Sequence, residues 1–174
     1  GKYYLTDRAL HAVLKFDPIT SNIELIAGSP TGEDGSANGN SVSARFLAPS
    51  GILSTRGGYV VADSGNHVIR FVSSAGDVTT LAGSATLFGF VNSADPTLAR
   101  FRFPTGLALD AAGNIFVADS LNHAIRIIDP ANVVTTIAIG FNQPNGISAG
   151  ANDTLWVADA RNNQIKLISS VTGA

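Results

Sequence analysis

The stretch NIFVADSLNHAIRII, residues 114–128, carries the pattern that decides the fold. Residues 115–118 are a short run of apolar, β-branched and aromatic side chains, and residues 123–129 alternate apolar with other side chains. Similar short runs lie on either side, at 105–110 and 132–137, and Gly, Asn, Asp and Pro separate all four. Runs of this length between turn residues predict β-strands, so the segment is expected to contain four of them.

The same pattern occurs four times along the 174 residues. Its anchor is an aspartate after each apolar run, and these anchors lie 56, 56 and 40 residues apart: Asp7, Asp63, Asp119 and Asp159. A four-stranded unit that repeats about every 40 residues is typical of a β-propeller blade. The second strand of the last three units, at 60–62, 115–118 and 155–158, is apolar on both faces, as expected for a blade with a neighbour on either side. Trp156 is therefore expected in the core, where the preceding repeat has Phe116.

The predicted fold is an all-β propeller of about four blades and about 14 strands, with the first and last blades incomplete. A parallel α/β sheet would need intervening helices, and no segment has the length and periodicity of one. Two long insertions connect the first three blades. The expected boundaries are 1–29, 49–84, 104–139 and 144–174 for the blades, and 29–48 and 84–103 for the insertions.

These repeats resemble the NHL repeat family. The third copy carries the resemblance through Pro104, Gly106, Gly113, Asn114, Val117, Ala118, Asp119, Asn122, His123, Ile125 and Arg126. The first copy departs from the pattern at Leu10 and the fourth departs at Asn163. The resemblance implies a ring of six blades, which four blades cannot close. Further blades of a longer chain, other copies that complete the ring, or an open head-to-tail assembly are expected to cover the open edges.

The composition excludes several classes of protein. Only 14% of the residues are charged, and the formal net charge is −2. A nucleic-acid partner is not expected, because nucleic-acid binders need a concentrated basic surface. No apolar run approaches the roughly 20 residues of a transmembrane helix, so membrane insertion is not expected. The chain has no cysteine, which excludes disulfides and thiolate chemistry. A charge-poor surface rich in Ser, Thr, Asn and Gly favours an extracellular or cell-surface location.

An Asp-x-x-Asn-His cluster is expected in the turn between the second and third strands of the blades. We interpret it as a structural turn motif, in which Asp and Asn cap backbone N–H groups and His bonds to the neighbouring blade. Recurrence favours this role, because a catalytic group is needed once and a brace is needed in every blade. A ring of histidines that binds zinc in the central channel is the alternative. The motif residues are Asp7, His11, Asp63, Asn66, His67, Asp119, Asn122, His123, Asp159 and Asn162.

Basic residues recur at one position of the third strand. Arg70, Arg126 and Lys166 occupy it, and the first copy has Leu14 there. Alternation along the strand places these side chains opposite the core contact, where solvated or paired surface charges are expected. An anion-binding stripe is the alternative.

The two insertions are the strongest candidates for binding loops, because they are expected on the same propeller face as the Asp-x-x-Asn-His turns. Exposed aromatic side chains on a loop indicate either a contact surface or packing over the blade edges. Glu33 and Asp34 suit calcium chemically, although the EF-hand spacing is absent. The arginines of the two Ala-Arg-Phe segments are expected to reach carboxylates or carbonyls of the next blade. The candidates are Glu33, Asp34, Arg45, Leu87, Phe88, Phe90, Arg100 and Arg102.

Asn152 begins an Asn-Asp-Thr sequon in a predicted turn, which makes it a glycosylation candidate if the protein is secreted from a eukaryote.

The favoured function is a non-catalytic binding or assembly module. It would recognise a protein or glycan through the loop-bearing face, or self-assemble through open blade edges, without a cofactor. The resemblance implies one alternative, a metal-dependent lyase or hydrolase with a central-channel site. The predicted innermost strands offer no carboxylate or histidine for such a site.

Overall fold

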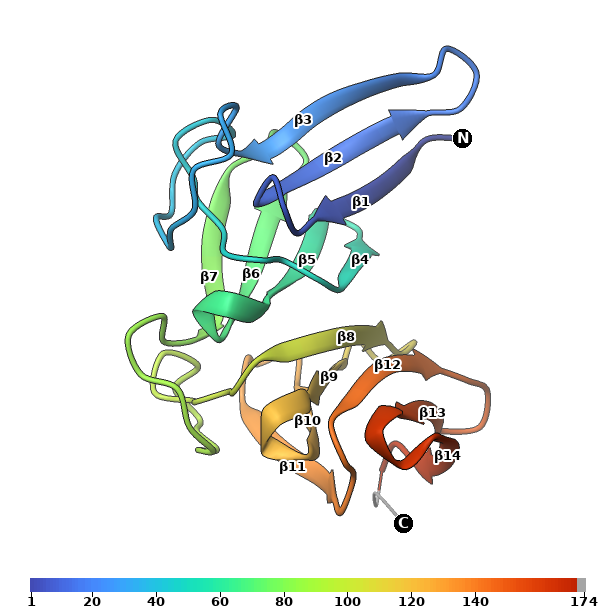
Figure 1. Cartoon of the computed structure of the whole chain (residues 1–174). Helices are drawn as coiled ribbons and strands as arrows, with labels where there is room; N and C mark the ends of the chain where they lie inside the picture. The colour runs from blue at the N-terminus through green and yellow to red at the C-terminus, as the bar shows by residue number, and fades with distance from the viewer. Residues whose placement is uncertain (172–174) are drawn as a thin grey trace.

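The computed structural model describes residues 1–171, which form 14 strands in four antiparallel sheets (Figure 1). The predicted all-β propeller fold is confirmed. Helical structure in this part of the chain is limited to three single turns, η1 (Ser64–Asn66), η2 (Ser120–Asn122) and η3 (Ala160–Asn162). Within residues 1–171, no helix has the length and apolar character needed to cross a membrane.

Each sheet is a blade whose strands are neighbours in sequence order. The first contains β1 (Tyr3–Asp7), β2 (Ala12–Asp17) and β3 (Asn22–Gly28). The second contains β4 (Ile52–Thr55), β5 (Gly58–Asp63), β6 (Val68–Ser73) and β7 (Val78–Gly83). The third contains β8 (Pro104–Leu109), β9 (Ile115–Asp119), β10 (Ala124–Ile128) and β11 (Val134–Ile139). The fourth contains β12 (Pro144–Ala149), β13 (Thr154–Asp159) and β14 (Gln164–Ser169).

The core consists of three apolar clusters, one between each pair of neighbouring blades. Val60 and Ala62 of β5 face the third blade, whereas Val61 faces the first. Both faces of the strand are therefore buried, which explains its continuous apolar run. Phenylalanines from the connections between blades complete these clusters: Phe46, Phe101 and Phe141.

The first strands of the blades approach one another closely at two glycines. The Gly51 N–H donates a hydrogen bond to the Thr105 carbonyl at 3.0 Å. A Cβ atom at Gly51 would lie 2.2 Å from that oxygen, and one at Gly106 would lie 2.2 Å from the Asn145 oxygen. No side chain fits at these distances, so the repeated Pro-x-Gly sequence sets how closely the blades pack.

The outer faces of the first and last blades are uncovered in the described chain. Trp156 is 51% exposed, whereas Phe116, its counterpart in the third blade, is fully buried. The expectation that Trp156 lies in the core is therefore wrong. The fourth blade covers Phe116, and no blade of the described chain covers Trp156.

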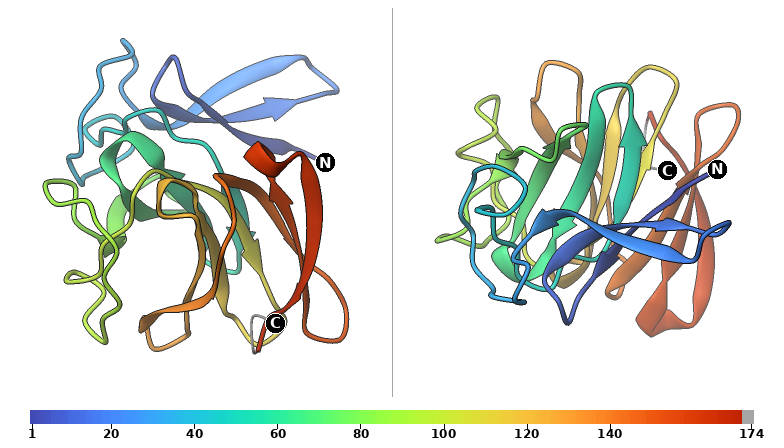
Figure 2. Two further views of the ribbon diagram at one scale, coloured as in Figure 1. Left: turned by 60° about the horizontal axis from the view of Figure 1, so that its bottom comes forward. Right: turned by 90° about the horizontal axis from the view of Figure 1, so that it is seen from above.

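Both insertions protrude on the same side of the molecule (Figure 2). We call this side the loop-bearing face. It comprises the two insertions, residues 29–48 and 84–103, the short connection 140–143, and the turns that follow β1, β5, β9 and β13.

Candidate binding site on the loop-bearing face

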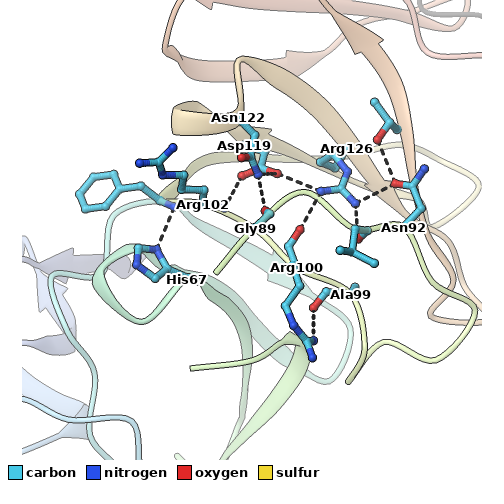
Figure 3. Close-up of polar contacts among 12 residues, drawn as sticks. His67, Gly89, Asn92, Ala99, Arg100, Arg102, Asp119, Asn122 and Arg126 are labelled. Atoms are coloured by element: carbon cyan, nitrogen blue, oxygen red, sulfur yellow. Dashed lines mark hydrogen bonds and ion pairs between the residues drawn. The ribbon is translucent and has the colours of Figure 1, made fainter. Parts of the chain in front are cut away.

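A buried ion pair fixes the second insertion to the third blade (Figure 3). Arg126 Nη1 lies 2.9 Å from Asp119 Oδ2, and both side chains are fully buried. The other guanidinium nitrogen, Nη2, donates to the Val91 carbonyl and to Asn92 Oδ1, each at 2.8 Å. Asn122 bridges Asp119 Oδ2 and the Gly89 carbonyl. The loop is therefore held at several points by charged hydrogen bonds inside the protein.

The second blade holds the first insertion in the same way. Arg70 Nη1 lies 3.0 Å from Asp63 Oδ2, and Nη2 donates to the Ala37 carbonyl and Asn38 Oδ1. Burial raises the pKa of Asp63 to about 6. Hydrogen bonds from Asn66 and from the Leu47 N–H, together with the charge of Arg70, partly offset this rise. Burial likewise raises the pKa of Asp119 and lowers that of Arg126.

The prediction that Arg70 and Arg126 are blade-surface charges is wrong, because both are fully buried. Alternation does place them on the opposite face from Ile69 and Ile125. In a propeller, however, that face packs on the preceding connection, and an aspartate on the same blade neutralises the charge there. The anion-binding stripe is excluded for the same reason.

Lys166 is the third basic residue and holds the short connection. Its Nζ lies 2.8 Å from Asp159 Oδ2 and donates to the Gly140 carbonyl at 3.1 Å. Hydrogen bonds from Asn142 N–H, Lys166, Asn162 and Gln164 outweigh burial and lower the pKa of Asp159. An arginine thus accompanies a long insertion, and a lysine accompanies a short connection.

The histidines of the turn motif bind the connection to the next blade. Nδ1 of His11, His67 and His123 accepts a hydrogen bond from the backbone N–H of Ala48, Phe103 and Gln143, at 3.0, 3.0 and 3.1 Å. Each histidine has a positive φ, between 53° and 61°. An acceptor Nδ1 requires the neutral ring, and burial followed by the Arg102 charge lowers the pKa of His67.

The motif aspartates differ in what they bind. Asp7 Oδ1 accepts from the N–H groups of Ala9 and Leu10 and so caps its own turn, as expected. Asp63, Asp119 and Asp159 instead accept from the N–H groups of Leu47, Arg102 and Asn142 in the preceding connections. The capping expectation is wrong for these three, because the adjacent connection supplies a buried donor that their own turns do not.

The loop arginines stay within their own insertions. Arg45 pairs with Glu33 at 2.8 Å and donates to the Val42 and Ala44 carbonyls. Arg100 donates to the carbonyls of Thr97 and Ala99. The expectation that these side chains reach the next blade is wrong; each tightens the turn from which it projects. Asp34 is an exposed neighbour of Glu33.

The second insertion displays exposed apolar side chains. Leu87, Phe88 and Phe90 are 57%, 60% and 51% exposed. The Phe88 ring lies 5.2 Å from the His67 ring, and the Arg102 guanidinium lies 5.5 Å from its centre. The Phe90 ring lies 4.9 Å from the Arg126 guanidinium. The aromatic rings thus rest on the turn motif with about half of their surface open.

A cavity of about 380 Å³ opens where the turns and the connections meet. Its walls come from the first, third and fourth blades: Arg8, Phe103, Thr105, Ser120, Leu121, Gln143, Asn145, Ala160 and Arg161. No carboxylate lines it. The repeated pattern of the sequence did not predict these residues. The sequence marks the two arginines only as departures from the repeat. Arg8 stands where other repeats have Ser64 and Ser120, and Arg161 stands where they have Gly65 and Leu121.

Asn152 lies on the opposite face. It is exposed in the turn between β12 and β13, beside a second cavity of about 260 Å³. Within residues 1–171, no three His, Asp or Glu side chains gather in a group that could hold a metal ion.

The four sheets, with an aspartate and a basic residue that hold the preceding connection in three of them, define a β-propeller array. The family model for the NHL repeat matches residues 101–128 and 141–166, in the third and fourth blades. The third and fourth blades therefore contain NHL repeats, and the first two blades repeat the same strand architecture.

Two relatives share part of the sequence. NHL repeat-containing protein 2 of Homo sapiens is 34% identical over 99 residues, which are 55% of this chain and 14% of that protein. Protein SUPPRESSOR OF QUENCHING 1, chloroplastic, of Arabidopsis thaliana is 37% identical over 73 residues, which are 41% of this chain and 7% of that protein. The chain thus spans a small part of either relative.

Solved structures share the fold at low identity. An auxiliary nutrient binding protein from Bacteroides thetaiotaomicron has a TM-score of 0.75 at 16% identity, covering 96% of this chain and 44% of its own. A chain in a nidogen/laminin complex has a TM-score of 0.74 at 15% identity, with coverages of 99% and 57%. Virginiamycin B lyase from Staphylococcus aureus has a TM-score of 0.67 at 17% identity, with coverages of 99% and 50%. Identities this low show the fold and carry no activity.

Proposed function

We propose that this chain is a non-catalytic binding module that holds a protein or glycan on its loop-bearing face. The observation that carries the proposal is the cavity of about 380 Å³, whose walls come from three blades. A concave site built on rigid strands and fixed turns is the usual setting for ligand binding. The buried Asp–Arg pairs support the proposal, because they fix the two insertions to the blades beside the cavity.

The open blade faces support a second role in assembly. Trp156, Ile165 and Leu167 on the fourth blade are 51%, 65% and 52% exposed, and Tyr3 and Ile23 on the first blade are 63% and 61% exposed. Apolar faces of this kind are association surfaces. In the proposal, further blades or other copies of the chain cover them, while the loop-bearing face stays free for the ligand.

An extracellular or cell-surface location belongs to the same proposal. It draws on the low fraction of charged residues, 14%, and on the exposed sequon at Asn152. Expression in a eukaryotic secretory system, followed by enzymatic removal of N-glycans, tests the sequon. A mass loss in the native chain that is missing in Asn152→Gln is expected. An unmodified Asn152 in secreted protein would contradict it.

A paired-variant experiment tests the binding face. Wild-type protein is screened against a glycan array and a panel of extracellular-matrix proteins, beside Phe88→Ser and Ile19→Ser. Ile19 is 85% exposed in the turn between β2 and β3, on the opposite face, and is the matched control. The proposal predicts that Phe88→Ser weakens binding and that Ile19→Ser does not. Equal loss in both variants would contradict the loop-bearing face as the site.

A further inference from the structure

We infer that the cavity on the loop-bearing face binds an acidic sugar, whose carboxylate or sulfate group lies between Arg8 and Arg161. This inference rests on the proposed function and names the ligand class of that site.

The charge of the cavity comes from two arginines without acidic partners. Arg8 follows β1 in the first blade and Arg161 lies in η3 of the fourth, yet both line the same cavity. Within residues 1–171, neither guanidinium forms an ion pair with a carboxylate. Arg161 Nε donates to Gln143 Oε1 at 2.9 Å, which orients the side chain and leaves both Nη groups for a ligand. Arginine forks of this kind suit planar or tetrahedral oxyanions.

Ser120 adds a buried polar group directed at the cavity. It is 7% exposed and lines the wall. Its counterpart in the second blade, Ser64, donates to the Pro104 carbonyl at 2.6 Å. No hydrogen bond of the Ser120 hydroxyl is found in the described part of the chain. The Ser120 hydroxyl is therefore available to bond to a ligand hydroxyl from the cavity wall.

The remaining walls suit a sugar ring better than a peptide. Gln143 and Asn145 provide neutral amide groups, which both donate and accept as sugar hydroxyls do. Phe103 and Leu121 provide an apolar surface for the C–H face of a ring. An extended peptide would instead need an open strand edge for backbone pairing, and the turns around the cavity offer none.

Calorimetry with defined oligosaccharides tests the inference. Trigalacturonate and a sulfated disaccharide carry the two anionic groups. Fully methyl-esterified trigalacturonate keeps the sugar rings and removes the charge. Binding of at least one acidic sugar is expected, with a loss of about tenfold or more for the methyl ester, since a hydrogen bond to a charged group contributes at least this much. Comparison of the two acidic sugars identifies the preferred anion.

Matched variants assign the site. Arg8→Gln and Arg161→Gln are each expected to weaken binding about tenfold or more, whereas Arg56→Gln, on the opposite face, leaves it unchanged. Circular dichroism confirms that the variants are folded. Equal affinity for the methyl ester, equal loss in Arg56→Gln, tighter binding of a hexaglutamate peptide, or no binding at millimolar sugar would overturn the inference. If acidic sugars fail to bind but Phe88→Ser still weakens binding on the array and Ile19→Ser does not, the acidic-sugar inference is wrong. The loop-bearing face then remains the binding site for a different ligand.

Discussion

Arg126 and Lys166 occupy the same position of their blades and hold connections of different length. Arg126 bridges Asp119 and two acceptors of the long insertion, Val91 and Asn92. Lys166 bridges Asp159 and a single acceptor, the Gly140 carbonyl. The guanidinium has separate nitrogens for the aspartate and for the loop, whereas the ammonium is a point donor. The residue at this position therefore determines how much of the connection is fixed.

Arg126→Met is expected to lower the free energy of unfolding by about 3–5 kcal/mol, because it leaves Asp119 buried without its cation. Arg126→Lys is expected to retain the ion pair and lose loop contacts, with a smaller loss. Urea denaturation measures both. Lys166→Met is the matched control and should cost less, because Lys166 is one-third exposed and Asp159 keeps hydrogen bonds from Asn142, Asn162 and Gln164. Equal losses at the two positions would contradict the difference in burial.

Amide hydrogen exchange in the second insertion should also respond to substitution of Arg126. Amides of residues 85–92 are expected to exchange faster in Arg126→Lys than in the wild type, because the Nη2 contacts to Val91 and Asn92 are lost. Residues 30–40 serve as an internal control, because Arg70 holds them independently. Unchanged exchange in both insertions would show that the Arg126 contacts do not order the second insertion.

Asp63 should make stability depend on pH between about 4 and 6. Its pKa in the folded protein is raised from 3.8 to about 6. The protonated side chain therefore contributes to the free energy of unfolding fully below pH 3.8, and this contribution is lost as the pH rises to about 6. The free energy of unfolding of the wild type relative to Asp63→Asn is expected to fall by roughly 1–3 kcal/mol between pH 4 and pH 7. Urea denaturation at each pH measures this difference.

Asp159→Asn provides a control with the opposite sign. The folded pKa of Asp159 is lowered, so its contribution is present above the unfolded value of 3.8 and is lost as pH falls below it. The free energy of unfolding of the wild type relative to Asp63→Asn should therefore change between about pH 4 and 6, and that relative to Asp159→Asn should change below pH 3.8. Parallel pH profiles would refute the assigned pKa shifts.

Gly106→Ala is expected to destabilise the protein strongly, because the new Cβ atom would lie 2.2 Å from the Asn145 oxygen. Gly146→Ala is the matched control. Gly146 holds the same repeat position in the fourth blade, and a Cβ atom there would meet only Ala158 Cβ, at 3.6 Å. Thermal denaturation should show a large loss for the first variant and little change for the second. Similar melting temperatures would mean that blade spacing tolerates a methyl group.

Trp156 is the only tryptophan and reports on the open face of the fourth blade. At low protein concentration, the 174-residue chain should show red-shifted emission that acrylamide quenches readily, because the side chain is 51% exposed. A blue shift with rising concentration, together with a larger sedimentation coefficient, would show that copies associate through this face. Blue-shifted emission from a dilute monomer is inconsistent with the structure.

The sequence predicted the strands because each blade repeats the same apolar runs and turn residues. It did not predict the burial of Arg70 and Arg126, because strand alternation does not show that a connection packs on the second face. It also missed the cavity, because Arg8 and Arg161 are far apart in sequence and meet only through the curvature of the array.

Amide chemical-shift mapping tests the central claim most directly, that the loop-bearing face holds the ligand. Isotope-labelled chain is titrated with trigalacturonate, and with any glycan that the array identifies. The account predicts shifts confined to residues 7–11, 84–105, 119–123, 142–145 and 159–163, around the turns and the cavity. Shifts concentrated in the opposite turns, at 55–58, 110–113 and 150–153, or on the strands around Trp156, would contradict it.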